Sequence, residues 1–259
     1  MKKETEETLA RSLTAETTEL IPFLPYLLQD LWALGSNPRD MLHLIKKHVP
    51  VSKAAKILDI ACGKGAISIT IARELVVNVY GFDLMPDFIQ YANKKAQKLN
   101  VSSLCHFSVA DANNVTSVET NYDCVIFGAA GNVLGSPQQM LDKLRRTIKP
   151  GGFIIFDECY LPDGSDNEKI KYKNYEFLTH GQWRQLFADN DLTLVEEMPS
   201  VETYDFDSDN KAIAARAREL TEKHPEKRAI FEQYIQSQLD ECDDLEHSVI
   251  GVTWILQKL

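Results

Sequence analysis

The sequence predicts an α/β protein built on a parallel sheet that helices cover on both faces. Between Lys56 and Glu158, short apolar runs typical of buried strands alternate with amphipathic stretches typical of helices. Repeated strand–helix–strand units form right-handed crossovers, and these build a parallel sheet between two helical layers. The chain has 259 residues, of which 44% are hydrophobic and 25% are charged, so it can bury one large core.

The individual runs give the elements in order. Strands are predicted in KILDIA, VNVYGFD, LCHFSVAD, YDCVIFG and FIIFDE, and helices in AISITIARELV, PDFIQYANKKAQKL and PQQMLDKLRRTI. A helix near residues 181–190 and a strand in DLTLVEEM follow, and SVIGVTWILQKL is predicted as the last strand. Strand and helix therefore alternate over most of the chain.

The N-terminal part has a different character. Residues up to Glu19 are polar with weak periodicity, and we expect a mobile arm there. The apolar segment LIPFLPYLLQDLWALG predicts one short helix that stops at Gly35. Asn37 as N-cap and Pro38 at the first helical position predict a second helix, which runs to about His48.

A long insertion separates the last two predicted strands, over about residues 200–247. It begins with a polar linker at 200–210 and continues with the helical patterns AIAARAREL and AIFEQYIQSQL. A break is predicted near His224 and Pro225. These helices have enough apolar positions to serve either as a lid over a site or as a dimer surface, so a homodimer stays open.

Charge and cysteine content exclude several classes of function. With 28 Lys+Arg against 38 Asp+Glu, the net charge is -10, and a field of that sign repels phosphate backbones and anionic lipid. We therefore expect neither nucleic acid nor a membrane as partner. The five cysteines lack metal-ligand spacing, so no metal site is predicted. No signal-like segment and no run of about 18 apolar residues occurs, and we expect a cytoplasmic protein.

A glycine turn carries the clearest chemical signal. In ILDIACGKG a buried strand holds Asp59 near its end, turns through Gly63 and Gly65, and enters a helix. Glycines let the backbone approach a ligand closely, and the helix N-terminus offers free N–H groups, so the turn favours a nucleotide. A nicotinamide fingerprint would need glycine or alanine three residues after Gly65, where Ser68 stands.

Two carboxylates end the next two predicted strands. Asp83 closes VYGFD, and Asp111 closes FSVAD. Open α/β sheets bind ligands in the crevice at the carboxyl ends of their strands, where a carboxylate can accept hydrogen bonds from ribose hydroxyls. Both residues are therefore predicted to line the same ligand site as the glycine turn.

From about Lys56 to Asp157 the chain resembles the class I S-adenosylmethionine-dependent methyltransferases. The resemblance rests on ILDIACGKG, on Phe82-Asp83, on Ala110-Asp111, on YDCVIFG and on LRRTIKPGGFIIFDE, in this order. It implies a Rossmann-like, doubly wound sheet of seven strands with a reversed last strand, a role that SVIGVTWILQKL fits. It also implies two parts, an N-terminal arm and helical lid over residues 1–50 and a methyltransferase domain over 51–259 that contains the insertion.

The resemblance also implies which residues hold S-adenosylmethionine. The implied contacts are Asp59, Gly63, Gly65 and the Ala61 backbone around the methionine part and ribose, Asp83 at the ribose hydroxyls, Leu84 on adenine, Asp111 with Ala112 at the adenine amino group, and Phe127 with Gly128 beside the sulfonium. Ala61 stands where many relatives have glycine. Tyr26 and Trp32 are either core residues or part of a lid that closes over the cofactor.

Candidates for the acceptor side follow the fourth and fifth strands. They are Asn132, Asp157, Glu158, Tyr160 and, further along, His180. The resemblance implies a methyltransferase that moves the methyl group of S-adenosylmethionine to a small-molecule acceptor in one in-line displacement, with S-adenosylhomocysteine as product. Two alternatives stay open: a regulatory module that binds the cofactor without turnover, and a nicotinamide oxidoreductase, which Ser68 disfavours.

Overall fold

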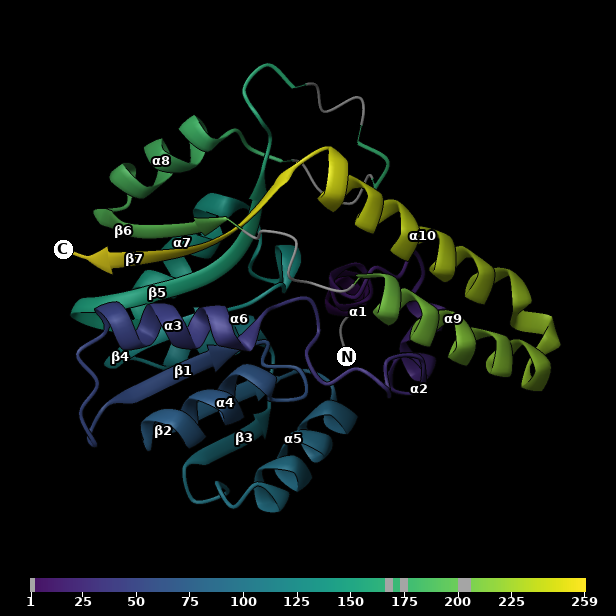
Figure 1. Ribbon diagram of the computed structural model, residues 1–259, viewed down its shortest axis with the longest axis horizontal. Helices are drawn as coiled ribbons and strands as arrows, with labels where there is room; N and C mark the ends of the chain where they lie inside the picture. The colour runs from purple at the N-terminus through teal and green to yellow at the C-terminus, as the bar shows by residue number, and fades with distance from the viewer. Residues whose placement is uncertain (1–2, 166–169, 173–176, 200–205) are drawn as a thin grey trace.

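A seven-stranded sheet forms the centre of the computed structural model, which describes residues 3–165, 170–172, 177–199 and 206–259 (Figure 1). Its order is β3-β2-β1-β4-β5-β7-β6. The strands are β1 (Lys56–Ile60), β2 (Asn78–Asp83), β3 (Cys105–Val109), β4 (Tyr122–Phe127), β5 (Ile148–Tyr160), β6 (Leu192–Pro199) and β7 (Ile250–Lys258). Strands β1 to β5 pair in parallel, and β7 pairs antiparallel with both β5 and β6. The predicted seven-stranded sheet with a reversed last strand is confirmed.

Helices cover both faces of the sheet, and each face has its own apolar cluster. The helices that pack on the sheet are α3 (Pro38–His48), α4 (Ala66–Leu75), α5 (Pro86–Lys98), α6 (Ala112–Val118), α7 (Pro137–Thr147) and α8 (His180–Asp189). Side chains of α3, α4 and α5 share one cluster with the sheet, and those of α6, α7 and α8 share the other. Two such layers fix the strand ends in space.

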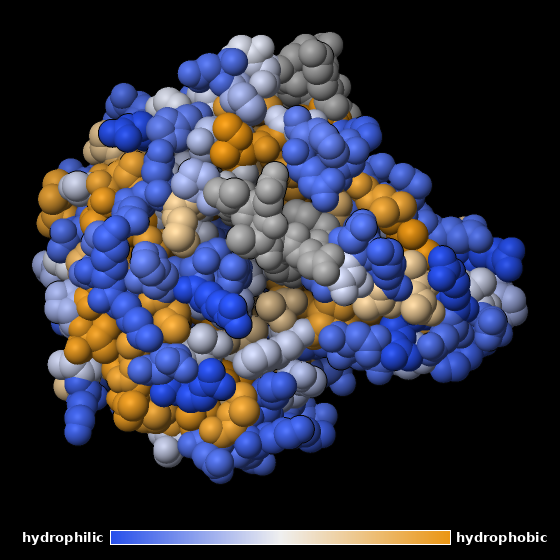
Figure 2. All heavy atoms as spheres, viewed as in Figure 1, coloured by the Kyte–Doolittle hydropathy of each residue, from blue (hydrophilic) through white to orange (hydrophobic). Residues whose placement is uncertain are grey.

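The N-terminal part and the insertion build a third cluster beside the sheet (Figure 1). It joins α1 (Lys3–Ser12), the 3-10 helix η1 (Thr18–Phe23), α2 (Leu24–Leu27), α9 (Phe206–Lys223) and α10 (Arg228–His247). The predicted break between the two insertion helices is confirmed at the short 3-10 helix η4 (Pro225–Lys227). Polar side chains gather over the far end of this α9–α10 hairpin (Figure 2).

Three expectations about secondary structure were wrong. The expected mobile arm contains α1, because Leu9 and Ala10 are buried in the third cluster. The single helix expected before Gly35 is instead η1 and α2 followed by turns, as Pro22 and Pro25 favour. Residues 206–210 of the expected linker belong to α9, and residues 200–205 lie outside the described residues.

Candidate active site

A cavity of about 1490 Å³ opens at the carboxyl ends of the parallel strands. Its wall includes the glycine turn after β1, the ends of β2 to β5, and side chains of α1, α9 and α10. Ligands of open α/β sheets bind at this edge. The cavity therefore lies where the sequence predicts the ligand site.

The glycine turn needs a left-handed backbone at three positions. Ala61, Gly63 and Gly65 have φ values of 56°, 52° and 74°. A Cβ atom added to Gly65 would lie 2.8 Å from the ring of Phe107 and 2.9 Å from Ala92, so only glycine fits there. Ala61 adopts the same region with a methyl group, at a cost of about 1–2 kcal/mol.

Asp83 ties the turn to the end of β2. Its carboxylate accepts hydrogen bonds from the backbone N–H of Gly63 at 2.9 Å and of Met85 at 2.8 Å. Burial raises the pKa of Asp83, and these backbone donors oppose the rise. A carboxylate has about four acceptor positions, so Asp83 can accept further hydrogen bonds from a ligand in the cavity that it lines.

The structure brings most, but not all, of the predicted cofactor residues to the cavity. Ala61, Gly63, Asp83, Leu84, Asp111, Ala112 and Gly128 line it, whereas Asp59, Gly65 and Phe127 are not in its wall. Asp59 is 1% exposed and accepts a hydrogen bond from the Ser68 hydroxyl at 2.5 Å. Burial raises the pKa of Asp59 to about 7. Asp59 therefore joins the end of β1 to α4 and does not line the cavity.

The acceptor-side candidates divide into two groups. Asn132, Asp157 and Glu158 line the cavity. His180 and Tyr160 are outside its wall: His180 bonds Glu197 at 2.8 Å, and its ring lies 4.9 Å from that of Tyr160. These last two residues therefore belong to the packing between α8 and the sheet.

Part of the N-terminal segment packs directly against the glycine turn. The Lys64 ammonium, on a side chain that is 3% exposed, donates to the backbone carbonyls of Leu28 and Leu31, the latter at 2.6 Å. In return the Trp32 indole donates to the Lys64 carbonyl at 3.3 Å. Burial lowers the pKa of Lys64 to about 8. Lys64 thus fastens residues 28–32 over the turn.

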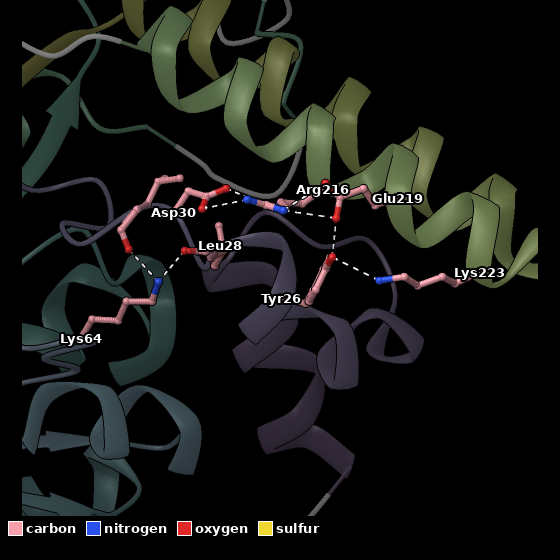
Figure 3. A network of polar contacts seen from close by, with 8 residues as sticks. Tyr26, Leu28, Asp30, Lys64, Arg216, Glu219 and Lys223 are labelled. Carbon is pink, nitrogen blue, oxygen red and sulfur yellow. Dashed lines mark hydrogen bonds and ion pairs between the residues drawn. The ribbon is translucent and has the colours of Figure 1, made fainter. Parts of the chain in front are cut away.

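A chain of polar contacts continues from this segment to the insertion (Figure 3). Asp30 accepts hydrogen bonds from Arg216 of α9 at 2.6 and 3.1 Å, and Arg216 also bonds Glu219 at 3.0 Å. Tyr26 donates to Glu219. Tyr26 does not line the cavity, whereas Trp32 does. The turn, the N-terminal segment and α9 are therefore joined in one network.

Three residues of this region were missed by the sequence reasoning. Lys64 lies inside the glycine turn, and Tyr234 and Glu241 of α10 line the cavity. A lysine in a turn and a glutamate on an amphipathic helix are ordinarily solvated, so their residue types gave no signal. Their positions depend on contacts between distant parts of the chain.

Two acids in the cavity wall predict a pH dependence of stability. Burial raises the pKa of Asp157 to about 6 and that of Glu158 to about 7, from ordinary values of 3.8 and 4.5. The folded state therefore binds more protons than the unfolded state, and stability should fall as pH rises from about 4 to 7. Scanning calorimetry should show a shallower fall of the melting temperature in Asp157→Asn and Glu158→Gln. The exposed Asp87→Asn should keep the wild-type slope, and equal slopes in all four proteins would contradict the prediction.

A family model described as a methyltransferase domain matches residues 51–198, which is more than half of the chain. This chain belongs to that family. Its fold is that of the class I S-adenosylmethionine-dependent methyltransferases, as the sequence resemblance implies. Among the described residues, no helix is long and apolar enough to cross a membrane, and no cluster of His, Cys, Asp and Glu could hold a metal ion.

Individual relatives of this methyltransferase differ in what they act on. This chain is 31% identical over 119 residues to a ribosomal protein L11 methyltransferase of Dechloromonas aromatica. The match covers 46% of this chain and 37% of that protein. A methyltransferase of Thiobacillus denitrificans in complex with S-adenosylhomocysteine superposes with a TM-score of 0.73 and 20% identity, over 92% of this chain and 98% of the other. The [4+2]-cyclase SpnF superposes with a TM-score of 0.74 and 13% identity, over 98% and 96%. The match to the L11 methyltransferase thus spans less than half of either protein. The proteins of similar fold include one that is named for a different reaction.

Proposed function

We propose that this methyltransferase transfers the methyl group of S-adenosylmethionine to a small molecule. The observation that carries the proposal is the cavity, because its wall combines the predicted cofactor residues with helices α1, α9 and α10. Its volume of about 1490 Å³ exceeds the range of about 300–1,000 Å³ that is usual for one small ligand. There is room for a cofactor and a small acceptor together.

The residues of the cavity fit the cofactor. Gly63, with its left-handed backbone, lines the cavity just before α4, and Asp83 offers free acceptor positions at the end of β2. Asp111, which caps α6 by accepting from the Asn113 N–H at 2.8 Å, lines the same side. Asp83 would hold the ribose hydroxyls and Asp111 the adenine amino group. The bound cofactor supplies the reactive methyl group on its sulfonium.

The protein itself would position the acceptor and shield the reacting atoms from water. Helices α1, η1 and α2 and the insertion helices α9 and α10 form the roof, and the Lys64 and Arg216 contacts hold that roof against the turn. Exclusion of water and alignment of an acceptor at about 3 Å from the methyl carbon are the main contributions a protein makes to such a displacement. A roofed cavity favours a small acceptor over a ribosomal protein, the substrate in the name of one relative.

Binding of S-adenosylhomocysteine tests the proposal. Calorimetric titration should show one site per chain, and ligand at about 100 times its Kd should stabilise the protein by about 2.7 kcal/mol, which raises the melting temperature by several degrees. S-adenosylhomocysteine release from S-adenosylmethionine in the presence of a small-molecule panel then measures turnover. No binding at millimolar ligand would reject the proposal. Preferential binding of a nicotinamide dinucleotide would favour the oxidoreductase instead.

A further inference from the structure

Three carboxylates gather in the cavity wall on the side away from the glycine turn. Asp157 and Glu158 lie at the end of β5, and Glu241 lies on α10. Each accepts a hydrogen bond from an uncharged donor: Thr253 bonds Asp157 at 2.5 Å, the Cys159 N–H bonds Glu158 at 3.1 Å, and Thr14 bonds Glu241 at 2.6 Å. None of the three forms an ion pair with a basic side chain of the described residues.

These carboxylates share one part of the cavity wall. Asp157, Glu158 and Cys159 are consecutive residues of β5, and all three line the same cavity as Glu241 of α10. Burial raises the pKa of the Cys159 thiol, and the charges of Glu158, Glu241 and Asp157 raise it further. Negative charge is therefore concentrated in this part of the wall.

The cations that line the cavity are engaged elsewhere. In the described part of the chain these are Lys64 and Lys143. Lys64 donates to carbonyls of the N-terminal segment, and Lys143 donates to the Leu134 carbonyl and the Asn113 side chain, both at 2.7 Å. Among the described residues, neither lysine neutralises the carboxylates near Cys159, so these residues favour a positive charge in this part of the cavity.

An aromatic residue with an unused hydroxyl completes this part of the wall. Tyr234 of α10 is 2% exposed and lines the cavity, and its hydroxyl has no hydrogen-bond partner among the described residues. A buried hydroxyl without a partner is unfavourable, and a ligand with a polar group would give it one. Tyr172, which is 3% exposed, lines the cavity beside the same elements and adds a second ring. Aromatic faces also attract organic cations.

We propose that the acceptor is a small organic amine, held as a cation by Glu158, Glu241 and Asp157 and packed against Tyr234 and Tyr172. This inference rests on the proposed function, because it names the substrate class of the same cavity. We call the five residues the amine subsite. Its charge and its rings match an ammonium group, and the methylated product of an amine can still carry that charge.

The amine subsite also contains a group that can take up the proton that the ammonium group must lose. An ammonium nitrogen has no free electron pair, so it must first lose a proton, and the Glu158 carboxylate, with a pKa of about 7, can act as the base that takes it. The neutral nitrogen then forms the bond to the methyl carbon while the bond between that carbon and sulfur breaks. Sulfur keeps the electron pair, and the charge of the former sulfonium passes to nitrogen. The atoms and charges balance without any further reactant.

Binding of a charged probe and its neutral analogue tests the inference. The probes are choline and 3,3-dimethylbutan-1-ol, which has the same shape without the charge, titrated by calorimetry into full-length protein with and without S-adenosylhomocysteine. We expect choline to bind at least tenfold more tightly than the alcohol. Glu158→Gln and Glu241→Gln should each weaken choline binding at least threefold, whereas Glu222→Gln, an exposed change on α9 outside the cavity wall, should not.

The readouts separate this inference from the proposed function. Tight S-adenosylhomocysteine binding together with equal affinity for the two probes, or no binding of either, would overturn the amine subsite and leave the proposed function intact. Wild-type choline affinity in both glutamine variants would overturn it too. Choline preference without any S-adenosylhomocysteine binding would support a cation site and reject the proposed function.

Discussion

Replacement of Asp83 by Ala should weaken S-adenosylhomocysteine binding about ten- to hundredfold. The carboxylate lines the cavity at the end of β2, where it has free acceptor positions for ribose hydroxyls. Hydrogen bonds to a charged group contribute about 1.5–3 kcal/mol, which corresponds to this loss of affinity. Calorimetric titration of the variant and the wild type measures the change.

Asp83 also stabilises the fold, and the experiment must separate this effect from its effect on ligand binding. Alanine leaves the N–H groups of Gly63 and Met85 without their acceptor, so the melting temperature of Asp83→Ala should fall as well. Asp83→Asn keeps the shape and one acceptor oxygen, and should lose less stability than alanine. The exposed Asp87→Ala on α5 is the matched control. Wild-type affinity in a folded Asp83→Ala protein would contradict the assigned role.

The sheet could be predicted because its signals are local. Each strand from β1 to β5 is a short apolar run next to an amphipathic helix, and such periodicity is present in the sequence itself. The start of α3 is equally local, because the Asn37 side chain accepts from the Arg39 N–H at 3.0 Å. Short α6 was not predicted, since ANNVTSV has no clear apolar face. The site at the strand ends then follows from topology alone.

The roof of the cavity could not be predicted, because it depends on contacts between the two ends of the chain. Thr14 bonds Glu241 across 227 positions, and Arg216 bonds Asp30 across 186. Segment α1 shows few apolar positions, yet Leu9 and Ala10 are buried in the cluster that the N-terminal segment forms with the insertion helices. No local pattern encodes such a pairing, so the sequence left lid and dimer surface as equal alternatives.

Replacement of Lys64 by Met should lower the affinity for S-adenosylhomocysteine about tenfold. The variant removes the donor that fastens the carbonyls of Leu28 and Leu31 over the glycine turn, and leaving such groups unpaired costs about 1–3 kcal/mol. The N-terminal segment should then open more often, and amide hydrogen exchange in residues 24–34 should accelerate. A point variant is preferable to truncation, since residues 9–31 also supply much of the third apolar cluster.

The pH dependence of binding distinguishes a fastening role for Lys64 from mere packing. Because the pKa of Lys64 is about 8, its ammonium loses charge between pH 7 and 9, and its hydrogen bonds to the two carbonyls weaken. Wild-type affinity for S-adenosylhomocysteine should therefore fall over this range, whereas Lys64→Met should start lower and change less. The exposed Lys94→Met on α5 should follow the wild type at every pH. Parallel curves for all three proteins would mean that the buried lysine only fills space, and closure over the turn would then have to depend on Trp32 and the Asp30–Arg216 pair.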